Sequence, residues 1–169
     1  WLNPGQREAA RLAIHCAGAD YSGKLRLKPR AADVVCDTIT NVRVTDRTLE
    51  ETILLNFTVT RAGVRRLEFL LPEWMADSRF SVPLLQRKSI AAAGEKHPGM
   101  VRVRLDLQED AMGEIRVVVE NDRLLAPGEH QAPIPAIVSA RTNRRYAVVE
   151  NAGRGEVVVD RDELRGMDP

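Results

Sequence analysis

Strict alternation of apolar and polar residues is the feature that most constrains how this chain can fold. In residues 100–108, MVRVRLDLQ, every second side chain is apolar, and most of those between are arginine or aspartate. Successive side chains of a β-strand point to opposite faces, so the pattern predicts a strand with one buried and one solvent-facing side. The same alternation dominates the chain after residue 20. We therefore expect an all-β fold.

Two longer alternating runs lie earlier, at residues 33–44 and 49–60, and the polar residues 45–48 between them favour a turn. This spacing predicts a long β-hairpin as the spine of the fold. The buried face of its second strand has one polar member, Glu51. The other members of that face are Leu49, Ile53, Leu55, Phe57 and Val59.

Further strands complete the predicted fold. Two more hairpins are expected, 100–108 with 113–121 and 144–151 with 156–160, because a short glycine-containing loop joins each pair. Shorter strands are expected at 24–28, 79–90 (broken at Pro83) and 135–140, and the proline-rich residues 125–136 are expected to form a loop or crossover. About ten strands with short connections predict an antiparallel two-sheet β-sandwich of Greek-key or Ig-like type, with a β-barrel as the alternative.

The N-terminal residues 3–18 carry two conflicting signals. Asn3 before Pro4, with Gly18 as a stop, is typical of a helix. The even positions from 10 to 16 are apolar, however, which is typical of a strand. We favour a strand, because the neighbouring segments are strands.

Composition limits the classes of partner. The 169 residues suit a single domain, 1–169, and because the first residue is not methionine we expect a piece excised from a larger multidomain protein. The 25 basic and 24 acidic side chains give a net charge of +1, which argues against a nucleic-acid partner. No apolar run approaches the roughly 18 residues of a membrane-spanning helix, so no membrane insertion of this segment is expected. No cofactor motif is present, and no cofactor is expected.

Cys16 and Cys36 are the only cysteines of the chain. A disulfide between them would indicate an oxidising compartment. The favoured alternative is that both are small buried side chains.

His97 and His130 are the candidates for acid–base chemistry. Both lie in loops rich in glycine and proline, each near a glutamate, Glu95 or Glu129. If the loops met, the two imidazoles could form a metal or general-base site. Solvated loop histidines are the favoured alternative, because no catalytic or zinc motif surrounds them, and we expect no enzyme activity.

The stretch RRLEFLLPEW, residues 65–74, ends a predicted strand at Pro72, which cannot donate a backbone hydrogen bond. We expect Trp74 to cap the core at this corner, with its ring buried and its indole N–H bonded to a carbonyl. The alternative places Trp74 and Glu73 on the rim of a ligand site, where Trp74 and Tyr146 could form a carbohydrate-binding groove.

These patterns favour a non-catalytic β-sandwich module with a structural or protein-interaction role, contacting neighbouring domains of its own chain or another protein. The chain is broadly similar to accessory sandwich domains of large bacterial secreted or envelope proteins, which implies an extracytoplasmic location. A carbohydrate-binding module is the alternative, although aromatic residues make up only 4% of the chain and a flat stacking platform is hard to assemble. A hydrolase or metal-dependent enzyme that uses the loop histidines is the third hypothesis.

Overall fold

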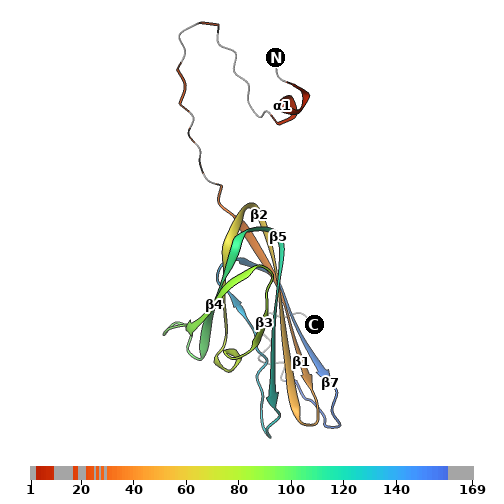
Figure 1. Cartoon of the computed structure of the whole chain (residues 1–169). Coiled ribbons are helices and arrows are strands. Elements are labelled where there is room, and N and C mark those ends of the chain that lie inside the picture. Colours follow the sequence, from red (N-terminus) through yellow and green to blue (C-terminus); the bar gives the residue numbers. More distant parts are fainter. Residues whose placement is uncertain are drawn as a thin grey trace.

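The computed structural model describes residues 3–9, 17–18, 22–24, 26, 28 and 30–159. Its elements, in chain order, are α1 (Pro4–Ala9), β1 (Asp33–Val44), β2 (Thr48–Pro72), η1 (Glu73–Met75), β3 (Arg79–Ser81), β4 (Leu85–Ala92), β5 (Met100–Leu124), β6 (Ala136–Ile137) and β7 (Arg141–Asn151). The described part of the chain is mostly β, as predicted (Figure 1).

Two very long strands organise the sheet. β2 and β5 have 25 residues each and pair antiparallel from Thr48 opposite Leu124 to Pro72 opposite Met100. Hydrogen bonds join seven strands into one sheet in the order β3-β5-β2-β1-β7, with β4 also on β5 and β6 also on β2.

Both long strands bend at the same level. Their register is interrupted between Val59 and Val64 of β2, opposite Ala111 and Gly113 of β5. Arg61 and Gly113 have φ values of 70° and 82°, the left-handed region that is common in β-bulges. Bulges bend a strand and increase its twist. Figure 1 shows β2 and β5 curving over together at one end of the sheet.

The bend divides the sheet into two layers. Layer A contains β1, β3, β7, residues 48–59 of β2 and residues 113–124 of β5. Layer B contains β4, β6, residues 66–72 of β2 and residues 100–107 of β5.

Short connections show that the two layers face each other. Ile137 of β6 pairs with Phe69 in layer B, and Arg141 of β7 already pairs with Val35 in layer A. The residues between them can span at most roughly 14 Å. The layers therefore lie face to face.

Apolar side chains of both layers share one core. Most of its buried members come from odd-numbered positions of β2 and β5, among them Ile53, Leu55, Phe57, Leu67, Phe69, Leu71, Val103, Leu105, Val117 and Val119. Cys36 and Met75 join the same cluster. The packing matches the predicted sandwich in outline. The separate sheets and the Greek-key or Ig-like topology are not confirmed, because one hydrogen-bonded sheet runs through both layers.

Two predicted hairpins are wrong, and the expected count of about ten strands is too high for the described residues. Residues 100–108 and 113–121 belong to the single strand β5, in which Gly113 supplies a bulge instead of a loop. Residues 144–151 do not pair with 156–159, which form no strand; β7 instead pairs in parallel with β1. The break at Pro83 is confirmed, since β3 and β4 lie on either side of it.

The favoured N-terminal strand is also wrong where it can be compared. Pro4–Ala9 forms the helix α1, and the N–H of Arg7 donates to the carbonyl of Asn3 at 3.0 Å. Proline at the first helical position lacks only an N–H that would have no helical partner, which favours the start of a helix here. Residues 10–16 lie outside the described residues. No helix in the described ranges is long and apolar enough to cross a membrane.

The bend gives a first prediction, at Gly63. A Cβ at this position would lie 2.8 Å from the Cβ and 3.1 Å from the carbonyl carbon of Asp110. We expect Gly63→Ala to lower the free energy of unfolding in urea by about 1–3 kcal/mol, because the two strands must separate locally. Gly155→Ala, where nothing lies within 4 Å, is the control and should change little. Equal stabilities for the two variants would contradict this close approach.

Candidate functional site

The two loop histidines are both exposed and both bonded locally. The backbone N–H of His97 donates to the Gly94 carbonyl at 3.1 Å, within the turn between β4 and β5. Nε2 of His130 lies 2.7 Å from the carbonyl oxygen of Ala126. Across residues 30–159 and the shorter described stretches, no group of three or more His, Cys, Asp or Glu side chains could hold a metal. Neither of these bonds links one histidine to the other, and their metal or catalytic role stays a prediction.

Cys36 is fully buried in the core as a free thiol. Burial, reinforced by the neighbouring charge of Asp37, raises the pKa of this thiol to about 12. The side chain is therefore protonated and unreactive at neutral pH. Cys16 lies outside the described residues, so the disulfide between the two remains untested.

The predicted corner after Pro72 exists, but a different residue fills it. β2 ends at Pro72, η1 follows, and Met75 is fully buried in the core. Trp74 is 40% exposed, so the expected burial of its ring is wrong. The ring lies over the guanidinium of Arg123, with 5.5 Å between Cζ and the ring centroid.

Arg123 belongs to a buried polar cluster that explains the single polar residue on the inner face of β2. The Glu51 side chain has no solvent exposure, and its Oε1 accepts hydrogen bonds from Nη2 and Nε of Arg123 at 2.7 and 3.0 Å. Its Oε2 accepts from Nδ2 of Asn121 at 2.8 Å. Arg123 also donates to the carbonyl of Gln131 at 3.1 Å. Trp74 lies over the arginine of this Glu51 cluster, and a ligand site at Glu73 and Trp74 stays a prediction.

Removal of one partner from the Glu51 cluster should be costly. Arg123→Met leaves a buried carboxylate without its cation, and we expect the free energy of unfolding to fall by about 3–5 kcal/mol. The double variant Glu51→Leu with Arg123→Met buries apolar side chains instead and should recover most of that loss. Urea denaturation of the three proteins measures both effects. A double variant as unstable as the single one would contradict a charge-based explanation.

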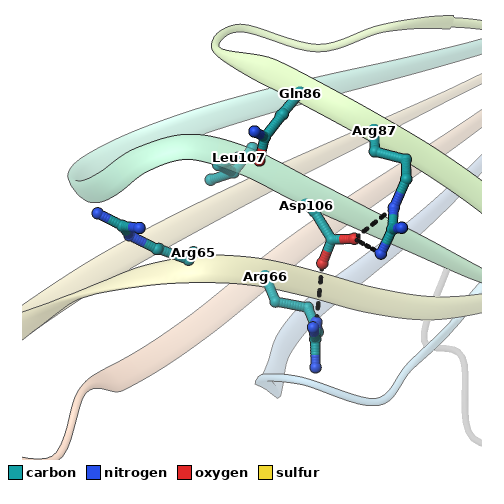
Figure 2. A pocket seen from close by; sticks show the side chains of 6 residues that line it. All are labelled: Arg65, Arg66, Gln86, Arg87, Asp106 and Leu107. Atoms are coloured by element: carbon teal, nitrogen blue, oxygen red, sulfur yellow. Dashed lines mark hydrogen bonds and ion pairs between the residues drawn. The ribbon is translucent and has the colours of Figure 1, made fainter.

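The outer face of layer B carries a shallow hollow lined by Arg65, Arg66, Gln86, Arg87, Asp106 and Leu107. Figure 2 shows the guanidinium groups of Arg66 and Arg87 converging on Asp106. Nε of Arg66 lies 2.9 Å from Oδ1, and Nη2 of Arg87 lies 2.9 Å from Oδ2. These hydrogen bonds lower the pKa of Asp106, and the bond from Arg66 contributes most. Arg65 pairs separately with Asp110 at 2.9 Å.

Each arginine of this hollow therefore already has a carboxylate partner. The carboxylate of Asp106 links three strands, because Arg66 lies on β2, Asp106 on β5 and Arg87 on β4. A carboxylate held ionised between two cations is a poor proton acceptor. The arrangement supports packing between strands and offers neither a nucleophile nor a general base.

A different kind of surface lies at the free edge of layer A. Ten of the eleven residues of β7 are exposed, on both faces of the strand. Three of them are large and apolar: Tyr146, Val148 and Val149, with exposures of 50%, 48% and 42%. β7 pairs with β1 on one side, and no strand of the described chain pairs with its other side (Figure 1).

The outer face of layer A continues this apolar surface inwards from β7. Tyr146 is opposite Ile39, Ile39 is opposite Leu54, and Leu54 is opposite Val118. A shallow hollow beside this row is lined by Asp37, Ile39, Leu54, Asn56, Arg116, Arg144 and Tyr146. Oδ1 of Asn56 is buried there without a hydrogen-bond partner among the described residues.

Trp74 and Tyr146 lie on opposite faces of the sheet. Trp74 covers Arg123, which is directly opposite the core-facing Leu49. Tyr146 shares the outer face with Ile39. The two rings therefore do not form the predicted groove together, and carbohydrate binding stays a prediction. The sequence did indicate a strand at 144–151, but no local signal identified it as a free edge.

Neither protein-family models nor curated proteins match this chain. Among solved structures, it is similar to a non-cellulosomal cohesin from the hyperthermophilic archaeon Archaeoglobus fulgidus, at 8% identity and a TM-score of 0.33, over 80% of this chain and 96% of that one. It is also similar to the seventh ScaB type I cohesin from Pseudobacteroides cellulosolvens, at 10% identity and a TM-score of 0.30, over 76% of this chain and 97% of that one. At these TM-scores, no residue, partner or role is transferred to this chain.

Proposed function

We propose that this chain is a non-catalytic β module that binds another protein, and that an extended segment of that partner pairs with the free edge of β7. The observation that carries the proposal is the exposure of β7 along nearly its whole length. An edge strand presents unpaired backbone N–H and C=O groups, and an extended segment of a partner can pair with them. Exposed apolar side chains at alternate positions then supply specificity.

The other edges of the sheet are protected in ways that β7 is not. β3 has three residues and β6 has two, which is too short to template a partner strand. β4 carries Lys88 near its middle, and lysine is the charged residue that most often protects an edge strand. β7 also carries charged residues, Arg144 and Arg145, beside its apolar centre. β7 contains neither proline nor lysine, and its centre is the apolar run Tyr146–Val149. Natural sheets usually avoid such an edge, so its presence supports a binding role.

The charged side chains also support a module without catalysis. The carboxylates of Glu51 and Asp106, the best shielded acids of the two polar clusters, are each bonded to arginine. They hold strands together, and neither of these two carboxylates is free to act on a substrate. We extend the proposal to a place in a larger extracytoplasmic protein, where the partner is a neighbouring domain or another chain.

Selection of peptides from a displayed random library against the purified chain tests this proposal. We expect extended peptides with alternating apolar residues, and we expect Val148→Asp to weaken their binding at least about tenfold, or 1.4 kcal/mol. Met112→Asp is the matched control, because Met112 is 60% exposed but lies at the bend. Binding that responds equally to both substitutions, or that responds to neither, would contradict a site on β7.

A further inference from the structure

The chemistry of β7 identifies one occupant for its free edge. We propose that a second copy of this chain binds there, with the two β7 strands antiparallel and the two-fold axis at Ala147. This inference rests on the proposed function, since it names the partner of the same edge. It follows from the order of side chains along the strand, RTNRRYAVVEN.

In this register, side chains of opposite charge, and apolar side chains, lie opposite each other on the outer face. Arg144 lies opposite Glu150 of the second copy, and Tyr146 lies opposite Val148 of the second copy. The two-fold axis repeats each pair, so four favourable pairs line the outer face. Oppositely charged pairs and aromatic pairs with β-branched residues are among those that stabilise antiparallel strands.

Neighbouring registers lose this match. An axis at Tyr146 places Arg144 opposite Val148, and an axis at Val148 places Tyr146 opposite Glu150. An axis at Arg145 brings two copies of that arginine together, and like charges directly opposite each other are unfavourable. Ala147 is therefore the centre at which both the charge and the apolar contacts of the outer face are satisfied. On the inner face, this register places Arg145 opposite Val149.

The charged groups are available for this contact. Arg144 is exposed and forms no ion pair with any described carboxylate. Glu150 lies 3.3 Å from Nε of Arg43, yet its side chain remains 53% exposed. One carboxylate between two arginines is an arrangement that this sheet already uses, since Glu68 pairs with both Arg102 and Arg104 at 3.4 and 2.9 Å.

β1 holds the edge in a regular conformation. Nδ2 of Asn143 donates to Oδ1 of Asp37 at 2.9 Å near the start of β7, and the N–H of Ala152 donates to the Val44 carbonyl at 2.8 Å after its end. The register with β1 runs without interruption from Arg145 to Asn151, and Arg144 lies at the irregularity just before it. The edge is thus preorganised, which reduces the entropy cost of pairing.

Sedimentation equilibrium of the full chain tests the inference. We expect a dimer. Arg144→Glu and Glu150→Arg each place like charges opposite one another, and each should raise the dimer dissociation constant at least about tenfold. The double variant Arg144→Glu with Glu150→Arg restores opposite charges and should restore the dimer. Arg141→Glu, which lies outside the paired positions, is the control and should leave the dimer intact.

The outcomes separate this inference from the proposed function. A monomer that still binds selected peptides at β7 overturns self-pairing and leaves the proposed function standing. A monomer that binds none overturns both. If both single charge reversals leave the dimer intact, the proposed register is wrong. It is also wrong if the single variants lose the dimer and the double variant does not recover it. A monomer whose β7 amides are protected from hydrogen exchange on both sides of the strand would show that another part of the same chain covers the edge, which also overturns the inference.

Discussion

The bend shared by β2 and β5 is the constraint on which the rest of this structure depends. Both strands have 25 residues, so a flat sheet built on them would leave its apolar face in water. The bulges between Val59 and Val64 and the left-handed residue Gly113 turn the sheet over on itself. Odd-numbered residues of both halves then meet in one core. Because β2 and β5 pair on both sides of the bend, one sheet forms both layers.

Polar contacts help to close the open end opposite the bend. Arg123 of the Glu51 cluster bonds the Gln131 carbonyl, and Oγ1 of Thr40 donates to the Pro133 carbonyl at 3.2 Å. These two bonds fix the proline-rich crossover that carries the chain from β5 to β6. After the crossover and β6, β7 pairs in parallel with β1, and the other edge of β7 has no strand partner among the described residues. The candidate binding edge is therefore a product of the same contacts that close the core.

The sequence predicted local features well and long-range features poorly. Residues 33–44 were expected as a strand and form β1, and the end at Pro72 follows from the missing backbone donor. Gly113 was misinterpreted because a hairpin loop and a bulge need the same left-handed residue. Glu51 was recognised as unusual, but Arg123, its partner 72 positions away, carries no local mark of the pairing. The free edge of β7 could not be predicted for the same reason, since it depends on which strands lie beside it.

The face-to-face folding of one continuous strand can be measured directly. Spin labels at Arg102→Cys and Glu120→Cys, on the two ends of β5, report its path in a Cys16→Ser background, where the buried Cys36 with a pKa of about 12 should not be labelled. Double electron–electron resonance should give a distance below about 30 Å, because stacked layers lie about 10 Å apart. A distance near 60 Å, the length of about 18 extended residues, would contradict the bend and the shared core.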